Sequence, residues 1–473
     1  MNKSKIIGVG LIASILSVNV MADNLLDVYR LAKDSDPTFL ASEAGTRASS
    51  ERVNQSMAGL LPQITGTISY SQSSSDSSGI YTIIGAVDNP ATLDVDESLP
   101  RNSANSSDTT SSGYSIRLNQ ELYNHSTWLN LKQSEKRELQ SKVNHEGSRQ
   151  NLIIRAAEAY FNVLAAKDSV AFSKAETEAV SKELAQTKQR FDVGLIAITG
   201  VHEAQSRYDL AIANQIAARN TLDNMYELLQ LITGNYHYNL LSLKQDIPLK
   251  NPNPENIKEW VKQAEANNIN IKAFNIGLDI AKRGISLSNS GHYPTLNLTA
   301  SYTDGSNDSD SQGTQFFGNL AITSSTNNDA EQQSSSIGVN FNIPIYSGGR
   351  TNAQVKEAQQ LYQQAAHNLE AERRRAVSLT RSSYLGVIAA VSSVNALKQA
   401  VISSEKSLEA IQAGFEVGTR TIVDVLLQTQ IVFNSKRQHA RARYDYVLNT
   451  LKLKQATGLL TEKDLAQVNQ LLR

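Results

Sequence analysis

The sequence predicts a protein of mixed α and β structure, in which long helices alternate with four β-strands and the whole arrangement occurs twice. Three observations lead to this fold class. Segments rich in Ala, Gln, Leu, Glu and Lys favour helices. Four other segments alternate apolar and polar residues with period two, as strands do. The two halves of the chain also share motifs at a constant spacing, which indicates duplication.

Residues 1–22 have the pattern of a secretory signal peptide. Two lysines precede an apolar run, and Ala22 supplies the small residue expected at a cleavage site. The competing interpretation is an uncleaved membrane anchor, but an apolar run of about 15 residues is short for a transmembrane helix. We therefore expect export from the cytoplasm and cleavage before Asp23.

The composition excludes several kinds of site. The 473 residues include 45 Lys and Arg against 46 Asp and Glu, so there is no basic excess for a nucleic-acid partner. The absence of cysteine excludes disulfides, thiolate metal sites and a cysteine nucleophile. We find no hydrolase or P-loop motif, and the histidines have no metal-ligand spacing. We therefore expect no catalytic residue, metal or cofactor, and we place the histidines at surfaces or interfaces.

Six segments have the composition and periodicity of helices. They are residues 24–59, 125–189, 200–233, 254–290, 350–412 and 421–457. Within the third, four apolar residues recur at spacings of 3, 4 and 3, the seam of a coiled coil: Leu222, Met225, Leu229 and Ile232. At about 1.5 Å per residue, the longest segments reach roughly 95 Å. Helices of this length must pack side by side rather than in a compact globule.

Four segments alternate apolar and polar side chains. They lie at about residues 60–72, 112–123, 294–304 and 334–346. A sandwich with one face in water would explain the alternation. Spans of about 10 residues, Tyr at the apolar ends and very unequal connections instead fit outer-membrane strands. We expect solvated, mobile loops where Ser, Asn, Asp, Gly and Thr dominate, at residues 73–111 and 305–333.

Four strands cannot close a membrane barrel, because the smallest barrels use about eight and an open edge in lipid leaves main-chain groups unpaired. The chain must therefore oligomerise. Two chains would give a barrel of about eight strands filled by its own side chains, whereas three would give about 12 strands and an opening along the axis.

The halves of the chain repeat at a spacing of 224 residues, at which the segment 191–201 matches the segment 415–425. Around the strands the spacing is 232, since Tyr70 corresponds to Tyr302. A period this long indicates duplication of a whole structural unit. We predict a first repeat at residues 23–240 and a second at 241–473, each with a helical turn, at 191–200 and 415–424.

Several motifs resemble the TolC family of outer-membrane efflux proteins over essentially the whole mature chain. They are Val193-Gly194-Leu195, Ala197-Ile198-Thr199, Thr233-Gly234-Asn235-Tyr236, Pro344-Ile345-Tyr346-Ser347-Gly348-Gly349 and the run from Gly418 to Leu426. The resemblance implies a homotrimer in the outer membrane of a Gram-negative bacterium. It also implies a 12-stranded β-barrel continued by a 12-helix periplasmic α-barrel of coiled-coil helices, with an equatorial layer formed by residues 235–260 and the C-terminus.

The resemblance further implies the exit duct of tripartite efflux pumps and type I secretion systems, not an enzyme. Such a duct lies in outer-membrane lipid and opens at its periplasmic end on docking to a periplasmic adaptor and an inner-membrane transporter. The alternative is a trimeric surface scaffold or adhesin with an anchoring barrel. An adhesin of that kind would carry its strands at the C-terminus, whereas here they are interleaved with the helices.

The two interhelical turns are the expected docking sites. Gly194 and Gly418 each end a long helix, where a left-handed residue costs Gly least. Simple capping would explain both. The resemblance instead implies that adaptor hairpins contact these turns, which consist of Val193, Gly194 and Leu195 and of Val417, Gly418 and Thr419.

Asp424 has two interpretations. The spacing Thr421-x-x-Asp424 is that of a helix cap. The resemblance implies instead that Asp424 lines a periplasmic constriction, where threefold symmetry makes a ring of three carboxylates. It also implies that Arg420 holds neighbouring helices together at the closed end, with Gln189 as one partner.

Three positions depart from the family pattern. Gly200 replaces an aspartate that pairs with the arginine, and Phe415 replaces a tyrosine whose hydroxyl would bond Thr199. Leu427 stands where a second acidic ring can occur, and it could narrow the pore as an apolar ring.

Overall fold

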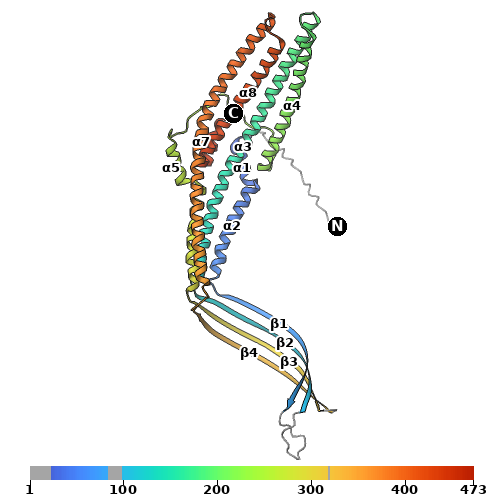
Figure 1. Ribbon diagram of the computed structural model, residues 1–473, viewed down its shortest axis with the longest axis vertical. Coiled ribbons are helices and arrows are strands. Elements are labelled where there is room, and N and C mark those ends of the chain that lie inside the picture. The colour runs from blue at the N-terminus through green and yellow to red at the C-terminus, as the bar shows by residue number, and fades with distance from the viewer. Residues whose placement is uncertain (1–22, 84–98, 318–319) are drawn as a thin grey trace, which may run out of the picture. The chain divides into compact units, whose positions relative to one another are not determined.

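The computed structural model describes residues 23–83, 99–317 and 320–473, so the predicted signal peptide lies outside the described residues. The chain divides into two compact units. We call the part up to Ala48 together with Leu139–Leu278 and Gln364–Arg473 the helical unit, and Ser49–Glu138 with Asp279–Gln363 the sheet unit. Figure 1 labels the elements.

The helices, in chain order, are α1 (Leu25–Ser35), α2 (Pro37–Ala58), α3 (His125–Asp192), α4 (Ile198–Thr233), α5 (Ile257–Asn267), α6 (Ile269–Asn289), α7 (Arg350–Glu416), α8 (Ile422–Ala456) and α9 (Glu462–Asn469). The strands are β1 (Gln63–Ile83), β2 (Leu99–Asn124), β3 (Thr295–Phe317) and β4 (Leu320–Asn342).

Two segments predicted as single helices are each broken. The segment 24–59 divides at Asp36, and the segment 254–290 divides at Asn268. Proline at position 37 disfavours the helical conformation of the residue before it, which explains the first break. At both breaks the side chain caps the next helix: Asp36 Oδ2 accepts from the amide of Phe39 at 2.8 Å, and Asn268 Oδ1 accepts from that of Ile271 at 3.1 Å. The two breaks lie 232 residues apart, the spacing that relates Tyr70 to Tyr302.

The core of the helical unit forms where α1, α3 and α8 meet. Leu25, Tyr160 and Leu451 are almost fully buried there. The predicted coiled-coil seam faces this core, since Leu229 is fully buried and the other three residues pack partly buried against it. The seam in α4 is therefore confirmed as a packing surface.

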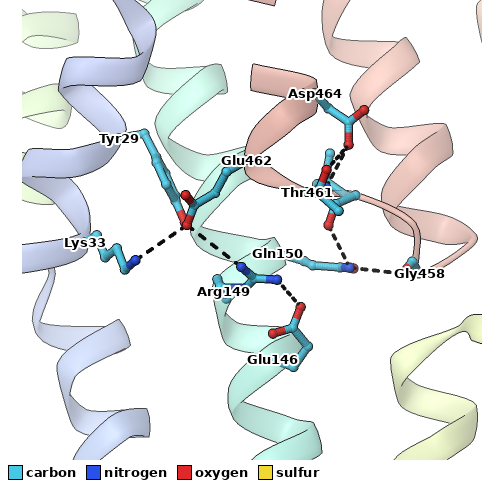
Figure 2. Close-up of polar contacts among 10 residues, drawn as sticks. Tyr29, Lys33, Glu146, Arg149, Gln150, Gly458, Thr461, Glu462 and Asp464 are labelled. Carbon is cyan, nitrogen blue, oxygen red and sulfur yellow. Dashed lines mark hydrogen bonds and ion pairs between the residues drawn. The ribbon is translucent and has the colours of Figure 1, made fainter. Parts of the chain in front are cut away.

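The C-terminal segment is joined to α3 by polar contacts, which Figure 2 shows. Gln150 Nε2 donates to the carbonyls of Gly458 at 3.2 Å and Leu460 at 3.0 Å. Thr461 and Asp464 form a capping box at the start of α9. These contacts satisfy main-chain groups that have no partner within a helix, because they follow the end of α8 or begin α9. They therefore fix where the chain turns after α8.

His237 lies in the segment between α4 and α5 and is only 3% exposed. Its Nδ1 lies 2.8 Å from Asp23 Oδ2, and its Nε2 lies 2.9 Å from Thr233 Oγ1. The prediction of a surface or interface histidine was wrong here, because both ring nitrogens find polar partners inside the unit.

The sheet unit holds one antiparallel sheet in the order β1-β2-β3-β4. Directly paired residues form one apolar row, Ile64, Leu118, Ala300 and Ile337, and the next row is polar, Thr65, Arg117, Ser301 and Ser336. The predicted alternation is thus confirmed. Ile68 is 89% exposed and Ile337 is 79% exposed, so the single chain leaves apolar side chains uncovered.

The strands are longer than predicted, and the two expected loops at 73–111 and 305–333 are largely strand in the described residues. The pairing continues through Ser-rich and Asn-rich sequence because main-chain hydrogen bonds do not require apolar side chains. Hydroxyl pairs also form across strands, such as Ser107 with Ser311 at 3.2 Å and Ser112 with Ser306 at 3.0 Å. Residues 84–98 and 318–319 of the predicted loops lie outside the described residues.

Candidate functional site

Two helix hairpins, α3 with α4 and α7 with α8, turn at the same end of the helical unit (Figure 1). Gly194 and Gly418 adopt left-handed φ values of 78° and 79°. The amide of Leu195 donates to the carbonyl of Arg190 at 2.8 Å, and the amide of Thr419 donates to that of Gly414 at 2.9 Å. This is the Schellman pattern of helix ends. Both glycines therefore end their helices as the sequence predicts.

The tips are apolar and open. Val193, Leu195 and Val417 are 70%, 72% and 75% exposed. A Cβ added to Gly194 or Gly418 would meet no atom within 4 Å. Exposed apolar side chains beside open main chain are available to a partner, although open space by itself does not identify one.

The two turns differ in how the following helix begins. At α8, Thr421 Oγ1 accepts from the amide of Asp424 at 3.3 Å, and the amide of Thr421 donates to Asp424 Oδ2 at 2.9 Å, which completes a capping box. At α4, the cap position is Ala197 and no side chain caps the helix. Gly200 occupies the position equivalent to Asp424. The start of α4 therefore lacks both side chains that cap the start of α8, those of Thr421 and Asp424.

Asp424 is a helix cap within the single chain, as its spacing predicts. Its pKa is lowered because the main chain and side chain of Thr421 donate hydrogen bonds to the carboxylate, with a smaller effect from Arg420. The carboxylate therefore keeps its negative charge at lower pH than an ordinary aspartate does. The hydrogen bonds in the described residues all use Oδ2, so Oδ1 is left for another ligand.

Phe415 lies in a buried cluster between the hairpins. It is 7% exposed and packs with Val180, Leu184, Ala204 and Val425, which come from the other three helices. This packing joins the two hairpins below their tips.

Arg190 is a residue that the sequence analysis missed. Its guanidinium lies 4.4 Å from the centroid of the Phe415 ring and donates to the Phe415 carbonyl at 3.1 Å. The equivalent position in the second half of the chain, 224 residues later, is Gly414, so the two halves differ here by a cationic side chain. The sequence alone shows this difference, but it does not show that Arg190 contacts Phe415.

Gln189, Thr199, Arg420 and Leu427 lie on the surface of the helical unit. In the described chain no hydrogen bond or ion pair joins Arg420 to Gln189, and Leu427 is 47% exposed. A Cβ on Gly414 would lie 2.8 Å from Arg420 Cγ, so this glycine lets the arginine fold back over the end of α7. A Cβ on Gly200 would lie 3.4 Å from Ile422, an ordinary contact.

Glu183 is a buried carboxyl between α3 and α8, below the tips. It accepts a hydrogen bond from Thr429 Oγ1 at 2.9 Å, while its Oε2 is buried with no partner in the described chain. Burial raises the pKa of Glu183, and the Thr429 hydrogen bond opposes this only partly. Across residues 23–83, 99–317 and 320–473, no three His, Asp or Glu side chains are grouped so as to hold a metal ion.

Comparison with known proteins is consistent along the chain. A family model described as outer membrane efflux protein matches residues 28–235 and 260–459. Outer membrane protein TolC of Escherichia coli K12 is 37% identical over 466 residues, which cover 98% of this chain and 88% of that protein. Alkaline protease secretion protein AprF of Pseudomonas aeruginosa is 23% identical over 456 residues, covering 96% and 88%. The crystal structure of the Campylobacter jejuni CmeC outer membrane channel superimposes with a TM-score of 0.69 at 15% identity, covering 95% of this chain and 90% of that one.

Proposed function

Because the chain belongs to the outer membrane efflux protein family, we propose that three copies of it assemble into one export channel that opens at its helix tips. The chain is an outer-membrane exit duct for efflux and type I secretion. The assembly, the docking surface and the gate are the parts that we propose beyond this.

The observation that carries the assembly is the open sheet. In the described residues β1 and β4 pair on one side only, and the apolar row that includes Ile337 is uncovered. In lipid, unpaired main-chain groups at a sheet edge cost several kcal/mol each, so the edges must meet those of other copies. Three copies supply about 12 strands and leave an axial opening, whereas two would give a filled barrel.

The four helices α3, α4, α7 and α8 supply the second part. Three copies contribute 12 such helices, which we propose form a periplasmic tunnel of paired coiled coils. The buried cluster around Phe415 supports this, because it already joins the two hairpins of one chain into a four-helix layer.

We assign the two repeats to residues 23–240 and 241–473. The separate stretches that the family model matches support this division. The equivalent helix breaks at Asp36 and Asn268, each capping the helix that follows, support it as well.

The exposed tips are the proposed docking surface for a periplasmic adaptor, with an inner-membrane transporter beyond it. Six tips in a trimer present a ring of apolar side chains around main chain that glycine leaves open. A partner that packs against this ring contacts both hairpins next to the buried Phe415 cluster that joins them. We propose that docking there separates the hairpins.

The proposed gate lies beside these turns. Asp424 faces the axis, where three carboxylates with lowered pKa attract cations. Arg420 and Gln189 lie on the surface, and no hydrogen bond or ion pair joins them in the described residues, so we propose that they bond across a protomer boundary. Thr199, Gly200 and Leu427 complete the surface around them.

The experiment uses the full mature chain in detergent and in planar bilayers. Analytical ultracentrifugation, corrected for detergent, should give about three times the mass of the chain. The same preparation should conduct ions and should co-purify with a periplasmic adaptor. A monodisperse monomer that keeps its strand content would contradict the proposed trimer. A trimer that neither conducts nor recovers an adaptor would favour the surface scaffold instead.

A further inference from the structure

A cavity of about 500 Å³ lies in the helical unit, away from the helix tips. Its walls come from α3, α7 and α8, from residues 242–246 and from the exposed Arg473. The walls carry four cationic side chains, Lys398, Lys436, Arg443 and Arg473, and two anionic ones, Asp168 and Asp246. Nothing in the duct or its gate uses this cavity.

Arg443 is the most informative wall residue because it is only 9% exposed. Its guanidinium donates to the main-chain carbonyls of Leu243 and Lys244. Its Nε is buried and has no partner, and no carboxylate in the described residues pairs with it. A buried charge without a counter-charge is strongly unfavourable, so this guanidinium calls for an anion.

The acids in the wall form no ion pair with Arg443 in the described residues. Asp168 accepts a hydrogen bond from the hydroxyl of Tyr444 at 2.6 Å. Asp246 is paired with the ammonium of Lys398 at 3.2 Å. Lys436 is paired with Glu405 at 2.7 Å, but the guanidinium of Arg473 has no acidic partner in the described chain. Arg443 and the exposed Arg473 therefore form no ion pair in the described residues, and the charge of Asp168 in the same wall is also left without a cationic partner.

The pKa of His439 reflects the positive charge of the cavity wall. Its pKa is lowered, first by burial and then by the positive charges of Arg443 and Lys398, against a smaller opposing effect of Asp246. No hydrogen bond to its ring is present in the described residues, so both nitrogens are available. A neutral imidazole beside two guanidinium groups that form no ion pair in the described residues can donate to an oxyanion, and it gains a proton more easily once one is bound.

We propose that this cavity binds a small free oxyanion, a phosphate or carboxylate group, between Arg443, Arg473 and His439. The anion neutralises the buried guanidinium and ties α8 to the segment 242–246. The volume is larger than one inorganic phosphate occupies, so it also accommodates a small organic phosphate or a dicarboxylate.

Sulfate is the probe of choice, because its charge does not change between about pH 5.5 and pH 8, where histidine titrates. Isothermal titration calorimetry on the intact detergent-solubilised protein, at constant ionic strength with chloride as the balancing anion, should show saturable binding. Arg443→Gln should weaken it about tenfold or more, since a hydrogen bond to a charged group is lost. Arg473→Gln should weaken sulfate binding severalfold without disturbing buried groups. This variant replaces Arg443→Gln as the test if Arg443→Gln does not fold. Lys406→Gln, an exposed α7 lysine paired with Glu409, should leave the affinity unchanged.

The pH dependence gives a second readout. The other charged groups that face His439 are Asp168 from α3, Lys398 from α7, Lys436 and Arg443 from α8, and Asp246 and Arg473. Sulfate affinity should rise severalfold as the pH falls from about 8 to about 5.5, because His439 becomes charged. His439→Gln should keep binding but lose this rise. Absent saturable sulfate binding, or equal affinities in wild type, Arg443→Gln and Arg473→Gln, would overturn the proposal.

Discussion

The guanidinium of Arg190 lies 4.4 Å above the ring of Phe415 and donates to its carbonyl at 3.1 Å. Arg190 lies in the last turn of α3 and Phe415 in the last turn of α7, so one cation joins the two hairpins immediately below their turns. The ring is buried against side chains of all the neighbouring helices. The contact therefore resists separation of the hairpins, which is the movement that the proposed opening requires.

Replacing this cation should loosen the tip. Arg190→Met keeps an apolar stem but removes the cation–π contact and the hydrogen bond, together about 1–3 kcal/mol. We expect higher single-channel conductance and faster hydrogen exchange at residues 411–420. Lys188→Met is the matched control, because its ammonium bonds Gln205 within the first hairpin at 3.4 Å. Equal conductance in both variants would mean that Arg190 only packs.

The charge and the capping role of Asp424 can be separated. Asp424→Asn keeps an oxygen for the amide of Thr421 but loses the charge, so it should abolish block by a trivalent cation added on the periplasmic side and reduce cation selectivity. Thr421→Ala removes the two hydrogen bonds of the Thr421 hydroxyl with Asp424, costing about 1 kcal/mol, and should leave the block in place. Because Leu427 adds no second ring, salt should readily screen the block. If the trivalent cation blocks the Asp424→Asn channel as strongly as the wild-type channel, the carboxylate is only a helix cap and the constriction lies elsewhere.

Gly200→Asp should restore an acidic partner for Arg420. The site has room, since a Cβ there makes an ordinary contact with Ile422. An acid in the first turn of α4 also favours that helix by about 0.5 kcal/mol. We expect lower bilayer conductance than wild type, whereas Gly200→Asn should give little change.

A double-mutant cycle identifies the partner of the new acid. Arg420→Ser alone should raise conductance by loosening contacts between helices. Adding Gly200→Asp to Arg420→Ser should then have no further effect. A decrease of the same size with and without Arg420 would show that the aspartate acts on the helix alone.

The turns can be tested for docking with paired substitutions. Gly194→Ala strains the left-handed turn by about 1 kcal/mol without adding bulk, whereas Gly194→Trp adds both. Gly194→Trp and Gly418→Trp should abolish export of a pump substrate while trimers still form, and Gly194→Ala should export at a reduced or normal level. Normal export by both tryptophan variants would leave the turns as caps only.

Glu183 predicts how stability depends on pH. Its folded pKa is raised by burial, so the native state holds its proton more tightly than the unfolded state does. This stabilisation is complete below the unfolded pKa and is lost as the pH rises through the folded pKa. Glu183→Gln should therefore melt higher than wild type at neutral and alkaline pH, with a smaller difference in acid. Glu178→Gln, an exposed carboxyl of the same helix, should follow the wild-type thermal melting curve at each pH.

The strands and the ends of the long helices could be predicted because their signals are local. Alternation over a few residues fixes which side chains share a face, as Ile64 and Ile337 do in one row. Gly194 and Gly418 end helices because a left-handed residue is needed there whatever surrounds it. The Thr421 and Asp424 cap follows from a spacing of three residues.

The strand ends could not be predicted in the same way. Composition placed loops from residue 73 and from residue 305, but pairing with a neighbouring strand satisfies the main chain there and Ser and Thr side chains bond across the ladder. Likewise, the break at Asn268 has no proline to announce it. Its side chain is fixed by the carbonyl of Ala456 at 2.8 Å, a residue 188 positions away.

What the sequence by itself determined is therefore where the four strands and the long helices lie and which turns join the long helices, since each depends on residues within a few positions. Only the tertiary structure decided that Arg190 meets Phe415, that Glu183 is buried and that Arg443 is buried with no carboxylate paired to it in the described residues. Each of these depends on which helices pack together, and the energy of a buried charge or ring is set by neighbours that lie far away in the sequence.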